Sequence, residues 1–285
     1  MRYVFMRYPM GRSKAVTFSY DDGVKQDQRL AALFTAHGLK ATFNFNCEAA
    51  REFCYTSDEI REYFLSKGHE IAVHGEYHRA LGSVRPIEGI RDVLHCRLEL
   101  EEKCGGIIRG MAYPDTGITK MNGPSSYEQI RQYLKELDIA YARTLAGDND
   151  SFRLPEDFYA WMPSAHHDNP KITEYIDKFL ALDLSTAVYR ASRAPRLMYI
   201  WGHSYEFDKK DNWAHIEEIC RKLSHHEDIW YATNIEICEY VEAYNRLRYS
   251  ANGKLAYNPT LHTLWLDVDG RVISIAPGET ARLEE

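Results

Sequence analysis

The chain has 285 residues, which is enough for one large α/β domain with a sizeable core. Its formal net charge is -7 and charges of both signs are mixed, so a basic surface for a nucleic-acid backbone is not expected. No apolar run has the length of a signal peptide core or a membrane span, and the six cysteines include no C-x-x-C pair. These features predict a cytoplasmic protein with reduced cysteines that acts on small molecules and binds neither nucleic acid nor membrane.

The first predicted strand ends on two adjacent carboxylates. Apolar and aromatic side chains alternate over residues 15–20, and Asp21, Asp22 and Gly23 follow directly. The alternation is typical of a strand, although Asp-Asp-Gly is also ordinary turn chemistry. Because neighbouring residues of an extended chain point in different directions, the two acids can take different roles, one on a metal and one as a proton carrier.

The chain then alternates between strands and helices, separated by glycine, proline and helix-capping residues. We expect further strands over residues 41–46, 70–73, 107–113, 139–142, 158–162, 196–201 and 229–232. We expect helices over residues 25–37, 57–67, 86–104, 125–137, 172–182, 213–223 and 235–248. Strands that alternate with helices are most simply joined by parallel connections, which predicts an α/β fold in the form of a complete or nearly complete (β/α) barrel.

The residues after 250 differ from this pattern. Two β-rich runs, 260–266 and 271–276, flank the segment 267–270, whose Asp-Gly pair is a hairpin signal. We therefore expect a barrel over residues 1–250 and a small β extension over residues 251–285 that packs on it.

Polar side chains recur where the predicted strands end. His74 and His78 follow the third strand, Arg143 follows the fifth and His203 follows the seventh. In a (β/α) barrel the C-terminal ends of the strands share one face, where active sites lie. We therefore expect these side chains near the two acids of the first strand.

Asp22, His74 and His78 have the composition of a catalytic metal site, which usually has three protein ligands and an open position. The histidines are four residues apart, which puts both side chains on one side of a helical turn or a tight loop. Polar loop histidines without a metal are the alternative. A bound metal makes water more acidic, Asp21 can accept the proton of that water, and His203 is the candidate acid for the leaving group.

These residues resemble the NodB-homology polysaccharide deacetylases, which are carbohydrate esterase family 4. Residues 17–23, Thr-Phe-Ser-Tyr-Asp-Asp-Gly, resemble the first motif of the family, and the His-x-x-x-His segment 74–78 matches the second. Segments 113–117 and 199–203 resemble the third and fifth motifs, so the resemblance extends over about residues 15–205.

The resemblance implies a distorted, incomplete (β/α) barrel and a metal-dependent hydrolase that removes acetyl groups from N-acetylated, or else O-acetylated, saccharides. It implies that Asp21 is the catalytic base, that Asp22, His74 and His78 bind the metal, and that His203 is the general acid. Zinc is the first expectation for the metal, with cobalt, nickel and manganese as alternatives. Two rival functions stay open: hydrolysis of small non-sugar amides or imides, and carbohydrate binding with weak catalysis.

The third motif departs from the family pattern. The family has an arginine beside the catalytic base, at the position that is Ala112 here. We expect another arginine in this role, with Arg143 as the first candidate and Arg109 as the second, although either can be an ordinary surface residue. The family's oxyanion contact comes from the loop that here holds Asp115 and Thr116, where an extra carboxylate is unfavourable unless it points away.

Several aromatic and polar side chains near these motifs are further candidates. The fourth motif, an acid and a tryptophan that orient the acid histidine, is suggested loosely by Asp157 and Trp161. Tyr113 and Trp201 can stack on a sugar, or pack in the core or at its rim. His166 can contact substrate, tune the acid histidine or lie in a solvated loop. Nothing in the sequence indicates the oligomeric state.

Overall fold

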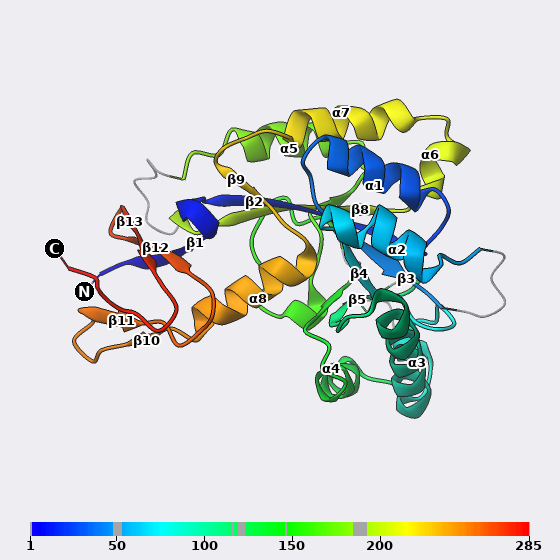
Figure 1. Ribbon diagram of the computed structural model, residues 1–285, viewed down its shortest axis with the longest axis horizontal. Helices are drawn as coiled ribbons and strands as arrows, with labels where there is room; N and C mark the ends of the chain where they lie inside the picture. The colour runs from blue at the N-terminus through cyan, green and yellow to red at the C-terminus, as the bar shows by residue number, and fades with distance from the viewer. Residues whose placement is uncertain are drawn as a thin grey trace.

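The largest unit of the computed structural model is an eight-stranded sheet in which every pair of neighbouring strands is parallel (Figure 1). The structure describes residues 2–47, 53–115, 117–118, 123–145, 147–184 and 193–284. The strands of this sheet are β2 (Lys14–Asp21), β3 (Ala41–Phe45), β4 (Glu70–Val73), β5 (Gly110–Ala112), β6 (Tyr141–Arg143), β7 (Ala165–His166), β8 (Arg196–Gly202) and β9 (Ile229–Tyr231).

The sheet is a curled, incomplete barrel with β2 at its centre. Its order is β6-β5-β4-β3-β2-β8-β7, and β9 pairs with the first half of β2. All eight residues of β2 are buried, as expected for a parallel strand covered on both faces. Between the edge strands β6 and β7, the described residues contribute one bridge, from Arg143 to Trp161. The predicted incomplete (β/α) barrel is thus confirmed.

Helices cover the sheet and connect its strands. In Figure 1, α1, α5 and α7 lie along one side of the sheet and α8 lies along the other. The helices are α1 (Asp27–Ala36), α2 (Ser57–Tyr63), α3 (Pro86–Cys104), α4 (Tyr127–Glu136), α5 (Ile172–Leu180), α6 (Tyr205–Lys209), α7 (Trp213–Leu223) and α8 (Asn234–Asn245), with short 3-10 helices η1 (Pro9–Gly11), η2 (Leu65–Lys67), η3 (Leu81–Ser83) and η4 (Phe158–Ala160). Within the described residues, no helix is long and apolar enough to cross a membrane.

Local sequence signals explain where several helices begin and end. Thr56, Ser126 and Thr233 open capping boxes before α2, α4 and α8, which satisfy the free amide groups of the first helical turn. Helix α3 starts at Pro86 and ends before Gly105, whose φ of 66° is left-handed.

One predicted strand is wrong. Residues 158–162 do not form a strand, because Phe158–Ala160 is the 3-10 helix η4, and the side chain of Asp157 accepts a hydrogen bond from the amide of Tyr159 at its start. Trp161 still bridges to the sheet edge. The strand that pairs with β8 at this edge is the two-residue β7.

The chain ends form two small antiparallel sheets. β12 (Leu264–Val268) and β13 (Arg271–Ile275) form the predicted hairpin, and β1 (Val4–Arg7) pairs with β12. The second sheet contains β10 (Arg248–Tyr249), β11 (Leu255–Tyr257) and β14 (Thr280–Arg282). Both termini lie beside these sheets at one end of the molecule (Figure 1). Since β1 shares a sheet with the tail, a domain boundary at residue 250 remains a prediction.

The buried side chain of His69 links α1 to β3. Its Nδ1 accepts the backbone N–H of Ala41 at 3.2 Å, and its Nε2 lies 3.0 Å from Oγ1 of Thr35. Burial lowers the pKa of His69 from 6.5 to about 4. We expect the free energy of unfolding to fall as the pH drops from about 6.5 to about 4, because the unfolded chain then binds a proton that the folded ring does not. At about 1.4 kcal/mol per pKa unit, the loss totals about 3 kcal/mol.

Urea unfolding of the wild type and His69→Gln between pH 7 and pH 4 measures this contribution. The stability advantage of the wild type over the variant should shrink as the pH falls. The half-exposed His95 supplies the matched control, and His95→Gln should follow the wild type. A difference between the wild type and His69→Gln that stays constant with pH contradicts this account.

Candidate functional site

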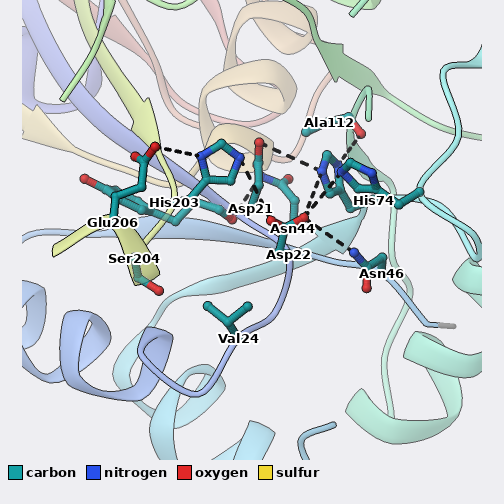
Figure 2. Close-up of polar contacts among 12 residues, drawn as sticks. Asp21, Asp22, Val24, Asn44, Asn46, His74, Ala112, His203, Ser204 and Glu206 are labelled. Carbon is teal, nitrogen blue, oxygen red and sulfur yellow. Dashed lines mark hydrogen bonds and ion pairs between the residues drawn. The ribbon is translucent and has the colours of Figure 1, made fainter. Parts of the chain in front are cut away.

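The side chains predicted to carry chemistry meet at the C-terminal ends of β2, β4 and β8 (Figure 2). Asp21 is the last residue of β2 and Asp22 follows it, His74 follows β4, and His203 follows β8. Figure 2 shows Asp21 and Asp22 between His203 on one side and His74 on the other. Segments far apart in the sequence thus present acids and imidazoles to one another.

A left-handed turn separates the environments of the two acids. Asp22 has a φ of 83°, which side-chain-bearing residues rarely adopt. Gly23 follows with a φ of 62°, and a Cβ there would lie 2.8 Å from the ring of Phe45. Asp21 stays in the strand and is 3% exposed, whereas the side chain of Asp22 is 18% exposed. The two neighbouring carboxylates are therefore suited to different roles.

Asp22, His74 and His78 form a compact group of metal-ligating atoms, all within 4.8 Å of one another. Oδ1 of Asp22 lies 3.6 Å from Nε2 of His74 and 3.4 Å from Nε2 of His78. Two ligand atoms on a tetrahedral ion with bonds of about 2.1 Å are about 3.4 Å apart. The spacing therefore suits one divalent cation.

The tautomer of His74 also suits a metal ligand. Its Nδ1 lies 2.9 Å from the carbonyl oxygen of Ala112, which can only accept a hydrogen bond, so Nδ1 carries the proton. The lone pair of Nε2 then faces Asp22 and His78, an arrangement common in metal sites. Burial lowers the pKa of His74 despite the neighbouring acids, which favours the neutral ring that binds metals.

Asp21 lies beside this group and is held by two donors. Nη2 of Arg143 donates to its Oδ2, and Nδ2 of Asn44 donates to its Oδ1 at 2.8 Å. Although burial opposes ionisation, the positive charge of Arg143 holds the pKa of Asp21 below its usual value. The guanidinium of Arg143 is itself buried and lies 4.8 Å from the ring of Trp201. Asp21 is therefore an ionised carboxylate in a fixed orientation.

Of the two predicted arginines, Arg143 lies at the site and Arg109 does not. Arg109 forms ion pairs with Asp138 at 3.2 Å and Glu239 at 3.3 Å, just before β5. Arg143 is the last residue of β6, so its side chain starts from the same end of the sheet as Asp21. The position in the fold therefore separates the two candidates.

His203 approaches the acids from the opposite side to His74. Its Nε2 lies 4.0 Å from Oδ2 of Asp22, and its Nδ1 lies 3.7 Å from Oε1 of Glu206 (Figure 2). Burial lowers the pKa of His203, but Glu206 and the two acids outweigh this effect and raise it. The ring thus holds a proton more readily than a free histidine, and its Nε2 faces the site.

Glu206 is a residue of the site that sequence reasoning missed. The expected partner of His203, Asp157, instead accepts a hydrogen bond from Tyr127 at 2.6 Å and pairs with Arg131 at 2.9 Å. Glu206 lies on the five-residue helix α6, three positions after His203. That spacing on a helical turn is the signal that would have identified it.

A second group of candidate ligands surrounds Glu206. Oε2 of Glu206 lies 3.2 Å from Nε2 of both His166 and His167, and Oδ2 of Asp168 lies 3.3 Å from Nε2 of His167. However, Nδ1 of His166 accepts the backbone N–H of Asp168 at 3.1 Å, so its Nε2 carries the proton and offers no lone pair to a metal. Lys210 also contacts the carboxylate of Asp168. This group suits polar contacts around Glu206 better than a cation.

The residues predicted to contact substrate, Tyr113, Trp201 and His166, differ in how far they are exposed. Tyr113 is 1% exposed and its hydroxyl donates to the carbonyl oxygen of Tyr159, so the prediction that it stacks on a sugar is wrong. Trp201 is half-buried, with the ring of His166 edge-on at 4.6 Å between centroids. The substrate roles of Trp201 and His166 stay predictions.

The loop after β5 places a carboxylate beside a ligand histidine. Oδ1 of Asp115 lies 3.7 Å from Nδ1 of His78, and its side chain is 50% exposed. The acid therefore faces the ring of His78, which it can orient, and does not point away from the site. Thr116 lies outside the described residues.

Part of the chain matches a known family, and its fold has solved counterparts. Residues 9–142 match the polysaccharide deacetylase family model. No curated protein matches the chain in sequence. The chain is similar in structure to Puue allantoinase, with a TM-score of 0.57 and 15% identity over 81% of this chain and 91% of that one.

Two further solved structures carry the same fold. A putative polysaccharide deacetylase from Mycobacterium smegmatis has a TM-score of 0.55 and 19% identity over 86% of this chain and 96% of that one. A probable polysaccharide deacetylase from Pseudomonas aeruginosa PAO1 has a TM-score of 0.51 and 12% identity over 81% and 92%. The segment matched by the family model holds Asp21 and all three residues of the compact group, Asp22, His74 and His78. Over residues 9–142 the chain is therefore similar to the polysaccharide deacetylase family, in agreement with the NodB-homology motifs that its sequence resembles.

Proposed function

We propose that the protein is a metal-dependent hydrolase that removes the acetyl group from an N-acetylated saccharide, or else from an O-acetylated one. The observation that carries the proposal is the arrangement of the compact group Asp22, His74 and His78, with the buried Asp21 on one flank and His203 opposite. A base, an acid and three cation ligands around one point are the parts that amide hydrolysis needs.

The residues present fit a divalent cation, for which zinc remains the first choice and cobalt, nickel and manganese the alternatives. Asp22, His74 and His78 would hold it, since their donor atoms have suitable spacing and His74 has the required tautomer. When bound, such a cation polarises the acetyl carbonyl and makes water more acidic.

The chain's own residues then move two protons. Asp21 accepts a proton from the attacking water, and its hydrogen bonds from Arg143 and Asn44 keep the carboxylate ionised and correctly oriented. His203 donates a proton from Nε2 to the leaving nitrogen or oxygen as the bond to the acetyl carbon breaks. Glu206 stabilises the protonated ring from its Nδ1 side. The products are acetate and a free amine or alcohol.

A small non-sugar amide or imide is the alternative substrate. The departure at Ala112 supports this alternative, since the arginine beside the base comes from β6 and not from the third motif. Both substrates would use the same base, acid and cation.

Acetate release tests the proposal. The purified protein, loaded separately with zinc, cobalt, nickel or manganese, is incubated with N-acetylglucosamine oligomers, acetylated xylan and a set of small amides and imides. We expect acetate from an acetylated saccharide with at least one metal, and none after chelation. Hydrolysis of small amides alone would assign the alternative substrate. Sugar binding with no hydrolysis of any compound would indicate a carbohydrate-binding protein.

A further inference from the structure

A buried hydrogen bond joins the loop that carries the proposed base to the loop that carries the proposed acid. Ser204 follows His203 directly, and Asp27 is the first residue of α1, just after the turn at Asp22. Oγ of Ser204 donates to Oδ1 of Asp27 over 2.5 Å, and both residues are 0% exposed. Figure 2 shows Ser204 on the segment of His203 and Val24 on the segment that leaves Asp22.

The other oxygen of Asp27 closes the turn after the paired acids. Oδ2 accepts the backbone N–H of Val24 at 2.9 Å, and the amide of Asp27 donates to the carbonyl oxygen of Val24 at 2.9 Å. The carboxyl group is therefore attached directly to the segment that follows Asp22. The carboxyl group of Asp27 therefore sets the position of Ser204 relative to Asp21 and Asp22.

Ser204 uses its hydroxyl for this contact and not for its own helix. It is the N-cap residue of α6, yet its side chain makes no capping hydrogen bond, although serine is among the residues best suited to that role. Helix α6 also carries Glu206, whose Oε1 lies 3.7 Å from Nδ1 of His203. The contact with Asp27 thus fixes both His203 and the carboxylate behind it.

Packing alone does not account for an aspartate here. Asp27 forms no ion pair with any described residue, and a buried carboxyl group without a cation is costly. Burial raises its pKa to about 8, so the group is retained in an environment that disfavours its charge. Two directed hydrogen bonds, one to each loop, are what this side chain contributes.

We propose that Asp27 and Ser204 are positioning residues that hold His203 in register with Asp21 and Asp22 for proton donation. The inference rests on the proposed function, because it requires His203 to act as the acid. Neither residue touches the substrate in this account. Their effect is on the orientation of the imidazole, where a displacement of about 1 Å can cost about a hundredfold in rate.

The Ser204→Ala variant tests the inference. We expect kcat to fall by about 10-fold to 100-fold, while KM and metal content stay at wild-type values. Ser204→Thr keeps the hydroxyl and should recover most of the rate, and Asp27→Asn, which loses one acceptor, should reduce kcat in the same way as Ser204→Ala. The matched control is Gln26→Ala, which removes an exposed 2.8 Å hydrogen bond to Asp208 between the same two segments and should leave kcat unchanged.

Amide hydrogen exchange supplies a readout that does not depend on activity. Residues 203–209 should exchange faster in Ser204→Ala than in the wild type or in Gln26→Ala. If the wild type hydrolyses no substrate, the proposed function fails, while unchanged exchange in Ser204→Ala separately overturns the positioning role. If the wild type is active and Ser204→Ala keeps its kcat, or changes only in KM, the inference is overturned although the function stands.

Discussion

The Asp21→Asn variant is expected to retain its metal and to lose about 10²-fold to 10⁴-fold in kcat, the usual contribution of a general base. An asparagine keeps the shape of the side chain but cannot accept the proton of the attacking water. Asp21 is not one of the three residues proposed as metal ligands, so cation binding should persist. Acetate release and metal content per chain, measured on the same preparation, give the two quantities.

Loss of the ion pair to Arg143 complicates this variant. Asparagine at position 21 leaves the buried guanidinium without its carboxylate, and breaking a buried pair typically costs about 3–5 kcal/mol. The double variant Asp21→Asn/Arg143→Met removes the unpaired charge and should regain stability without regaining turnover. Asp115→Asn alters a half-exposed acid that can orient His78, so it should change metal affinity and keep the wild-type kcat once the metal is saturating. Native turnover in Asp21→Asn would refute its role as the base.

The His74→Ala variant is expected to lose the metal and, with it, nearly all activity. His74 is buried, and its Nε2 faces Asp22 with the proton held on the other nitrogen. Even residues that only support a ligand typically change metal affinity by about 10-fold to 100-fold, so removing the ligand should exceed that range. Calorimetric titration with zinc and metal content after dialysis measure the change.

His166→Ala is the matched control, because it removes another imidazole from a group of similar composition. The His166 ring accepts a backbone hydrogen bond on Nδ1, so its Nε2 is protonated and should not bind the cation. Metal content should therefore stay at the wild-type value. Equal loss of metal in both variants would contradict the distinction between the two groups. Full metal content in His74→Ala would show that the cation does not bind at Asp22, His74 and His78.

Much of the fold followed from local signals that have direct physical causes. The predicted bounds of α3 and α7 agree with the structure, since proline, glycine and apolar periodicity mark them. The predicted strand at 158–162 failed because aromatic residues suit both a strand and a core-facing loop. The ring of Trp161 is buried against Tyr141 and Tyr199, which satisfies the hydrophobic pattern without a strand.

The candidate site was predictable where residue type and strand end coincide. Asp21, Asp22 and His74 come directly at or after buried strands, so the topology brings them together. Glu206 was missed although its i,i+3 spacing from His203 is a local signal. Asp27 was not found because its importance comes from a contact with Ser204 on a distant segment. Tyr113 was misassigned because the direction of its hydroxyl depends on the carbonyl of Tyr159, which the order of residues does not reveal.

At Asp22, the residue that would best stabilise the backbone differs from the residue that the proposed metal site needs. A left-handed aspartate is less favourable than glycine by about 1 kcal/mol, so selection for heat resistance alone would favour glycine at position 22. That exchange would remove a carboxylate proposed to bind the cation. Engineering that aims at a hardier protein should therefore hold this position constant and seek its gains elsewhere.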